Sequence, residues 1–381
     1  MARNIAASRL SNKLVRGQLS FEPAGPQDRQ DILRILRENP VGGRFGISME
    51  REPDPYASDF GLSPNHLTVI ARDIVTGAAA GMCERTVFNA YVDGEVRALP
   101  YIGGLRAEQN YRHRISAIKG GFEAFRVFGE RSGELPFALT SITSDNQAAR
   151  RLLTAGLNGL PHYSPVGEFT TFVMRPRAQT RPKGIRIGSA ADIPAIVNLL
   201  NRRARQFQFT PAWTIADVRG LANHGLPAEA FVLCGEGARI SGCMAVWDQT
   251  ANRQVVARSY PPLLGKLRRL ANMLSPISRL PSFPPVGKPM RMATLSHLAV
   301  EDDDPDIFLR LVKAGLRLAK AKRFEQVAMG MASERNLCKH VRMSLRTIEY
   351  QTMLYLVHQP GHKALVDALQ PGLAQPELGL L

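Results

Sequence analysis

One feature limits the possible folds of this 381-residue chain more than any other: the same order of predicted elements occurs twice. Between the two occurrences lies a polar, basic segment, PRAQTRPKG, Pro176 to Gly184. Apolar periodic segments flank it on both sides, which is typical of a linker between domains. We therefore predict a first domain over 1–176, a linker over 177–184, a second domain over 185–360 and a C-terminal tail over 361–381.

Hydrophobic periods of two and of 3.6 residues alternate along each half. In the first half they predict strands and helices in turn over 19–22, 26–39, 66–73, 78–88, 96–105, 114–128, 137–141, 146–155 and 169–174. In the second half the order recurs, with one extra helix, over 185–188, 192–205, 214–223, 231–234, 240–247, 292–300, 305–322, 327–331, 336–343 and 350–357. Runs of strands with helices inserted at particular places predict an α/β fold of two tandem domains. Each would be a mixed, mostly antiparallel sheet flanked by helices.

Composition and cysteine content narrow the class of protein. The chain is 44% hydrophobic and 22% charged, which is ordinary for a globular protein. No apolar run approaches the roughly 20 residues that cross a bilayer, and the basic start lacks the apolar stretch of a signal peptide. The four cysteines form no CxxC pair. We therefore expect a cytoplasmic protein with no transmembrane segment and no structural metal.

The formal net charge of +16 favours an anionic partner. A phosphate-bearing cofactor, an acidic protein, nucleic acid and an anionic membrane surface all fit, and simple solubility of a basic protein is the alternative. Because the chain shows no aromatic and basic platform, binding to nucleic acid is not expected. The net charge therefore indicates only that a partner would be negatively charged. Its identity has to come from the motifs.

A proline-edged insertion over 259–289 contains no Asp or Glu. Inside it, a stripe of apolar residues recurs at helical spacing: Leu263, Leu267, Leu270, Met273, Leu274, Ile277 and Leu280. Basic residues accompany the stripe: Lys266, Arg268, Arg269 and Arg279. Our favoured interpretation packs the stripe against its own domain, and Pro276 should kink or break the helix. The alternative is weak contact with a membrane surface or a docked partner through 263–280.

The stretch from Tyr101 to Phe125 carries the clearest chemistry. A strand ends there in a short basic turn, which leads into an amphipathic helix. The unpaired N–H groups of the helix start and the helix dipole both favour a phosphate. Arg112 and Arg114 add two guanidinium groups, which can hold phosphate oxygens bidentately. The turn is therefore a predicted diphosphate site, with a solvated basic helix start as the alternative.

The same turn resembles the L-x-V-x-P-x-Y-R-G-R-G-x-G/A motif of the GNAT superfamily of N-acetyltransferases. Leu105, Tyr111, Arg112, Arg114 and Ala117 keep the pattern. Gln109 replaces the proline, and His113 and Ile115 replace the turn glycines. The resemblance implies a cofactor site made by these residues: Leu105, Arg106, Ala107, Arg112, His113, Arg114, Ile115, Ser116, Ala117 and Asn146.

A second run, Ser144 to Leu157, is similar to the later N-x-x-A-x-x-x-Y-x-x-x-G-F element of that superfamily. Asn146 and Ala149 match. The tyrosine that often protonates the departing thiolate in the superfamily is replaced by Leu153. Tyr163, ten residues further on, is the candidate acid in its place.

The resemblance implies acyl transfer from acetyl-CoA or a longer acyl-CoA to an amine-bearing acceptor, with no metal. An acyl carrier protein is the alternative donor, as in long-chain N-acyl amino acid synthases of similar fold. Glu84 is the nearest candidate base. Its alternative is an exposed strand residue paired with Arg85. A different class of function is a catalytically inactive acyl-CoA-binding sensor or scaffold.

The second half carries weaker matches to the superfamily. Its corresponding turn, Glu301 to Asp304, holds four carboxylates and should repel a diphosphate. His297, on the strand before that turn, is a candidate ligand or base, although a hydrogen-bonded histidine within the sheet is the simpler interpretation. We predict that this half has lost cofactor binding.

Overall fold

The computed structural model describes residues 13–41, 45–56, 62–63, 65–112, 114–178, 180–237, 239–278 and 280–381. The strands of the first half are β1 Leu14–Arg16, β2 Leu19–Pro23, β3 Gly46–Glu50, β4 Leu67–Asp73, β5 Ala79–Val92, β6 Glu95–Ala107, β7 Phe137–Thr143 and β8 His162–Met174. Its helices are α2 Arg29–Glu38, α3 Ile115–Ala124 and α4 Gln147–Leu153. Each element predicted for this half is present, and β5, β6 and β8 run further than their sequence patterns indicated.

The second half repeats this order. Its strands are β9 Ile185–Ile187, β10 Thr210–Pro211, β11 Phe231–Glu236, β12 Arg239–Trp247, β13 Gln254–Ser259, β14 Met292–Val300, β15 Gln326–Ala332 and β16 Thr347–His358. Its helices are α5 Ile193–Ala204, α6 Ile215–Gly220, α7 Pro262–Ser278, α8 Pro305–Ala321, α9 Leu337–Ser344 and α10 Lys363–Asp367. α7 continues past Pro276 and ends two residues later, so this proline lies in the helix's last turn.

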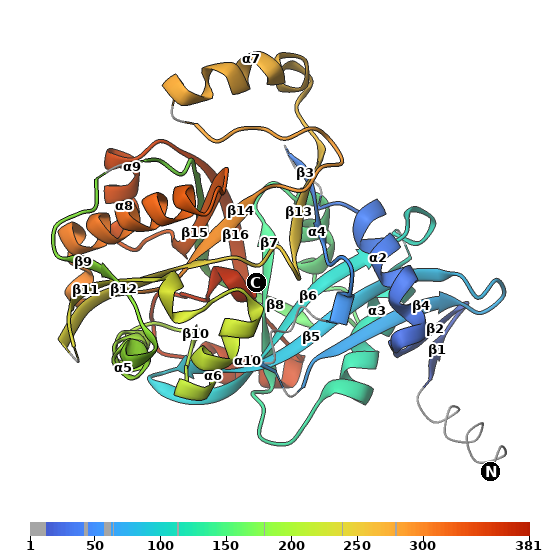
Figure 1. Ribbon diagram of the computed structural model, residues 1–381. Helices are drawn as coiled ribbons and strands as arrows, with labels where there is room; N and C mark the ends of the chain where they lie inside the picture. Colours follow the sequence, from blue (N-terminus) through green and yellow to red (C-terminus); the bar gives the residue numbers. More distant parts are fainter. Residues whose placement is uncertain are drawn as a thin grey trace, which may run out of the picture.

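A single sheet runs through both halves (Figure 1), in the order β1-β2-β4-β5-β6-β7-β16-β8-β15-β14-β12-β11-β9. The two halves exchange their last strands: β16 pairs with β7 of the first half, and β8 pairs with β15 of the second. β8 and β16 also pair with each other, antiparallel, along their whole length. The fold class is therefore as predicted, a mixed and mostly antiparallel sheet with flanking helices.

Helices cover both faces of the sheet in each half because the strands are apolar on both sides. Along β12, Met244 and Val246 belong to the core beneath α8. The alternate residues Cys243, Ala245 and Trp247 belong to the core beneath α5 and α6. Successive side chains of a strand point to opposite faces, so one strand supplies both cores.

The first half has the same layers on a smaller scale. Phe21 and Val69 belong to the core beneath α3. Ile70 packs on the other face with α2, against Ile32 and Ile35. The duplicated element order therefore corresponds to a duplicated pair of helical layers.

Two features join the halves beyond the main sheet. β3 and β13 form an antiparallel ribbon between segments about 200 residues apart in the chain, with Met49 opposite Val255. The segment predicted as a C-terminal tail folds back onto the sheet, where Leu378 and Leu381 pack against a core cluster of both halves. Neither feature has a strong periodic signal in the sequence, because the segments are short.

Candidate functional site

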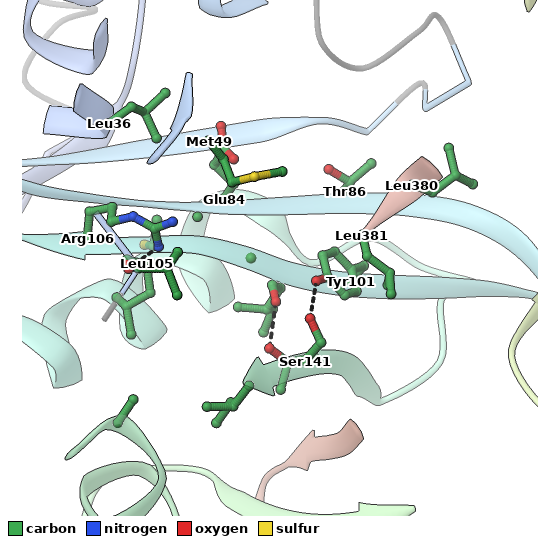
Figure 2. Close-up of a pocket in the computed structure, with 18 of the residues that line it drawn as sticks. Leu36, Met49, Glu84, Thr86, Tyr101, Leu105, Arg106, Ser141, Leu380 and Leu381 are labelled. Atoms are coloured by element: carbon green, nitrogen blue, oxygen red, sulfur yellow. Dashed lines mark hydrogen bonds between the residues drawn. The ribbon is translucent and has the colours of Figure 1, made fainter. Parts of the chain in front are cut away.

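A cavity of about 380 Å³ opens where β6 and β7 separate (Figure 2). Among the described residues, these strands pair only at Tyr101 opposite Leu139. One residue further along β6, the Thr140 hydroxyl donates to the carbonyl of Ile102 at 2.7 Å. Beyond that point β6 lines the cavity with Gly103, Gly104, Leu105 and Arg106. The separation leaves an opening between two neighbouring strands of a continuous sheet.

Glu84 lies at the wall of this cavity on β5 and is only 4% exposed. Its carboxylate is ion-paired with Arg51, through both guanidinium Nη atoms. The Thr68 hydroxyl donates to Glu84 Oε1 at 3.3 Å. Arg85 points elsewhere and pairs with Glu134. The alternative of an exposed Glu84 paired with Arg85 is therefore wrong.

Burial by itself would raise the pKa of Glu84, but the Arg51 charge and its hydrogen bonds outweigh burial and lower the pKa to about 2. The carboxylate is therefore ionised at neutral pH and has a low affinity for a proton. These surroundings favour a role for Glu84 as a permanent negative charge. The role of Glu84 as a catalytic base remains a prediction.

Backbone conformation brings Glu84 and β6 together. Gly104 has a φ of +60°, and a Cβ at this position would lie 2.5 Å from Glu84 Oε2. The register between β5 and β6 shifts at the same place, between Met82 and Glu84. Such a bulge re-aims side chains and ends regular pairing. Gly104 is required both for its conformation and for the close approach.

Arg106 and Leu105 also line the cavity, and Figure 2 shows both beside Glu84. Arg106 donates from Nη1 to the carbonyl of Leu105 at 2.9 Å. Its Nε is buried and has no hydrogen-bond partner among the described residues. Burial lowers the pKa of Arg106, against the opposing charge of Glu84. The β6 end of the cavity therefore carries a guanidinium group with donor capacity left over.

Asn146, which lies between β7 and α4, and Tyr163, on β8, line the same cavity. Asn146 caps α4, and its Oδ1 accepts from the N–H of Ala149 at 3.2 Å. Tyr163 packs edge-on between Phe122 and Tyr355, and burial raises its pKa above the ordinary value. Leu153 lines the cavity nearby. Tyr163 therefore does enter the space that Leu153 borders, and it keeps its proton at neutral pH.

The basic corner lies just outside this cavity. Arg112 folds back onto the strand end: its Nε donates to the carbonyl of Ala107 at 3.1 Å and its Nη2 to Asn39 at 2.8 Å. Arg114 stacks on the ring of Tyr111 at 4.8 Å and donates to Gln18 at 3.1 Å. His113 lies outside the described residues.

The start of α3 completes that corner. Arg114 is its N-cap residue, and Ile115 and Ser116 in its first turn are exposed, while Ala117 is half-buried. Neither the two arginines nor this first turn lines the cavity. The predicted site residues therefore fall into two adjoining groups. Glu84, Leu105, Arg106, Asn146 and Tyr163 surround the cavity, whereas the basic turn faces solvent.

A second cavity, of about 250 Å³, adjoins the first. Ile47, Met49, Thr143, Arg253, Thr352 and Leu381 line both. Its outer wall is a group of aromatic rings from four segments, with Phe45 between Tyr260, Phe283 and Tyr350 at centroid distances of 6.0–6.4 Å. The lining that the structure describes includes no carboxylate side chain. The two cavities share these lining residues, and both are mainly apolar.

Sequence reasoning missed several residues of this site. His66 and Arg51 lie beside Glu84, with 4.0 Å from His66 Nε2 to Glu84 Oε1. Tyr101 shares a 2.9 Å hydrogen bond with Ser141, and burial raises its pKa. Leu380 and Leu381 enter from the C-terminal segment (Figure 2). Only the aromatic-glycine run around Tyr101 offered a signal in the sequence.

The second half repeats the bulge but fills the space. His297 on β14 has a φ of +52°, next to a register shift on β12 between Cys243 and Ala245. Its ring stacks on Trp213 at 4.4 Å, and burial lowers its pKa to about 3. Nδ1 lies 2.9 Å from the Ser296 hydroxyl, whereas Nε2 has no hydrogen-bond partner among the described residues. His297 is therefore only half satisfied by hydrogen bonds.

The carboxylates of the acidic turn after β14 form ion pairs with arginine side chains of the second half. Arg335 pairs with Asp303 at 2.7 Å, and Arg202 pairs with Glu301 at 2.7 Å. Asp304 caps α8 through the N–H groups of Asp306 and Ile307. The second half's counterpart of the basic corner is therefore an internal ion-pair network.

No protein-family model matches the chain, and no curated protein matches it. Solved structures do match. Saccharomyces cerevisiae N-myristoyltransferase with bound myristoyl-CoA aligns with 12% identity and a TM-score of 0.60, over 91% of this chain and 80% of that chain. A GCN5-related N-acetyltransferase from Sphaerobacter thermophilus aligns with 12% identity and a TM-score of 0.51, over 91% of this chain and 98% of that one.

The chain has the fold of the GNAT superfamily of N-acetyltransferases, as its motifs indicated. More particularly, both halves together follow the N-myristoyltransferase structures, so the match includes the duplicated arrangement.

No helix in the described part of the chain combines the length and apolarity needed to cross a bilayer. Over the same residues, no cluster of three His, Cys, Asp or Glu side chains is placed to hold a metal ion.

Proposed function

We propose that the protein is an N-acyltransferase that moves an acyl group from a thioester donor to an amine. One observation carries this: a cavity with ionisable groups opens where β6 and β7 separate, and the basic turn that follows β6 along the chain faces solvent. A chain-like donor with an anionic head and an apolar tail matches that sequence of environments. The similar fold of N-myristoyltransferase, whose structure holds myristoyl-CoA, supports the same proposal.

The donor would be an acyl-CoA longer than acetyl-CoA. The start of α3, with Arg112 and Arg114, would hold its phosphates. Leu105, Arg106, Ala107 and Asn146 would follow the arm of the donor. The cavity is large for an acetyl group, and its lining includes Ile118, Phe122 and Ile142. An acyl carrier protein presenting the same arm is the alternative donor.

The acceptor would enter through the second cavity. That space reaches the first beside Arg253, whose Nη1 lies 3.1 Å from the carbonyl of Gly379. Its apolar and aromatic lining, without carboxylate side chains among the described residues, favours an acceptor that carries an apolar group near its amine. The cytoplasmic location remains a prediction.

Roles for the polar residues follow from their surroundings. The amine must lose a proton before it attacks the acyl carbon, and the thiolate that leaves must gain one or be stabilised. Glu84, already ionised, would attract the acceptor's ammonium group toward the cavity. His66, whose Nε2 lies 4.0 Å from Glu84 Oε1, would be the proton acceptor in its place, because a carboxylate with a pKa of about 2 binds a proton weakly. Tyr163, which holds its proton, would supply one to the thiolate.

A second candidate function is a sensor or scaffold that binds acyl-CoA without turnover. Two observations favour it: Leu153 stands where the superfamily has its tyrosine, and Glu84 is held by Arg51. Such a protein would still bind the donor but would not transfer its acyl group.

Mass spectrometry of small molecules that co-purify with the protein tests the proposal directly. A bound acyl thioester would identify the donor and its chain length. Incubation of that donor with a panel of amines should then release free thiol. Binding of the thioester without release of thiol over that panel would favour the sensor. Absence of binding both to acyl-CoA and to acylated carrier protein by titration calorimetry would reject both functions.

A further inference from the structure

The helix α7 has its apolar side facing outward. The side chains of its stripe are strongly exposed: Leu263 72%, Leu267 46%, Leu270 51%, Met273 76%, Leu274 49% and Ile277 81%. At about 100° per residue, these six residues fall within an arc of roughly 120° on one side of the helix. The favoured expectation, that the stripe packs on its own domain, is therefore wrong.

The polar side of α7 faces the protein instead. Asn272 accepts from the N–H of Phe283 at 2.7 Å and donates to its carbonyl at 2.8 Å. Arg268 donates to the same carbonyl at 3.0 Å. Ser275, 1% exposed, donates to the carbonyl of Leu280 at 3.0 Å and accepts from Arg175. Side-chain hydrogen bonds thus fix which side of α7 faces outward.

Its position allows contact with a broad surface. Figure 1 shows α7 projecting beyond the body of the molecule, on the side where the ribbon of β3 and β13 lies. The 17 residues of α7 span about 25 Å. The exposed arc is therefore on a convex ridge of the protein.

Charge indicates what covers this ridge. Between Asp248 and Glu301 the chain has no acidic residue, yet it has eight basic ones: Arg253, Arg258, Lys266, Arg268, Arg269, Arg279, Lys288 and Arg291. Lys266, which lies inside the arc near one edge, and Arg269, about 40° beyond that edge, are both exposed. An aliphatic arc bordered by cations, with no carboxylate nearby in the sequence, complements an anionic phospholipid surface, where the side chains enter the acyl boundary and the cations meet the head groups.

We propose that α7 is an interfacial helix, by which the protein binds reversibly to membranes rich in anionic phospholipid. The side chains of Leu263, Leu267, Leu270, Met273, Leu274 and Ile277 insert, and Lys266 and Arg269 lie among the phosphates. The aromatic wall of the second cavity includes Tyr260 and Phe283, which flank α7 in the chain. The helix therefore brings that cavity close to the lipid. The proposal does not depend on the acyl-transfer function.

Flotation of the full chain with vesicles tests it. We expect binding to vesicles of phosphatidylglycerol and phosphatidylcholine in equal parts, and much less to phosphatidylcholine alone. Leu267→Gln with Ile277→Gln should weaken partitioning into the vesicles more than about tenfold, because two aliphatic side chains that insert into the lipid are lost. Lys266→Gln with Arg269→Gln should weaken it by about tenfold on anionic vesicles only.

Matched controls separate insertion from general stickiness. Met343→Gln and Val75→Gln change two exposed apolar residues elsewhere, 81% and 81% exposed, and should leave vesicle binding unchanged. Thermal unfolding should be the same for all variants, because the changed side chains are exposed. A Leu270→Trp variant should be quenched by brominated lipid, whereas the native Trp213 and Trp247, 6% and 0% exposed, should not be.

Three outcomes would overturn the proposal. The first is no binding of the wild type to anionic vesicles at low salt. The second is equal binding by wild type and the Leu267 and Ile277 variant. The third is a stable complex with an acidic acyl carrier protein, or a dimer of this chain, that needs α7 while vesicle binding is absent.

Discussion

At the scale of single residues, Gly104 makes the site possible. We expect Gly104→Ala to lower the free energy of unfolding by more than the roughly 1 kcal/mol that a positive φ alone costs an L residue. The reason is the Cβ, which would lie 2.5 Å from Glu84 Oε2. Gly94→Ala is the control, because Gly94 has a φ of +77° and an added Cβ would meet no described atom within 4 Å. Equal losses in urea unfolding for the two variants would contradict the argument.

The Glu84 and Arg51 pair gives a second prediction at this scale. Glu84→Gln should cost about 3–5 kcal/mol, because it leaves a buried guanidinium without its partner. The double variant with Arg51→Gln should recover much of that loss. Asp367→Asn, which breaks an exposed pair with Lys363, should cost less than about 1 kcal/mol. A loss no larger for Glu84→Gln than for Asp367→Asn would mean that the pair is not a buried charge pair.

The pH dependence of that pair has a definite sign. Folding lowers the pKa of Glu84 from 4.5 to about 2, so the stability it contributes is present above pH 4.5 and is lost as the pH falls toward 2. The stability difference between wild type and Glu84→Gln should therefore be constant from pH 5 to 8 and should narrow below pH 4.5. A difference that narrowed between pH 6 and 8 would contradict the lowered pKa.

At the scale of elements, the side chain of Gln254 reinforces the end of the ribbon of β3 and β13. Gln254 accepts from the N–H of Glu52 at 2.9 Å and donates to its carbonyl at 2.8 Å, across 202 residues of chain. Gln254→Ala should cost about 1–3 kcal/mol, from two hydrogen bonds. We expect faster amide exchange in 46–50 and 254–259, with the rates in β8 and β16 unchanged. Unchanged exchange in the ribbon would show that its backbone pairing suffices.

At the scale of the whole molecule, the exchanged strands make the two halves one folding unit. A fragment of residues 13–178 lacks β16, so the pairing edges of β7 and β8 that face β16 in the full chain would be open. We expect that fragment and 180–381 to aggregate or stay unfolded when each is expressed alone, and to form a stable complex when co-expressed. Size-exclusion chromatography and far-ultraviolet circular dichroism measure this. A monomeric, cooperatively folded single half would contradict it.

Much of the architecture was predictable from the sequence because it depends on local periodicity. In α8 the capping Asp304 and Pro305 come directly before the helix's apolar stripe. The predicted range differs from the observed one by a single residue. The longer strands of each half were predicted for the same reason, whereas the short strands β1, β3, β10 and β13 were not predicted. Leu105 and Asn146, from the two parts of the motif, also line one cavity, because both parts lie next to regular elements.

What the sequence determined by itself was therefore the element order, its duplication and the superfamily's fold. The tertiary structure alone decided three things: the exchange of β8 and β16, the partner of Glu84, and the outward side of α7. Each depends on contacts between segments far apart in the chain. Periodicity states that a strand or helix has an apolar side, but only packing decides whether that side meets the core or, as in α7, the solvent.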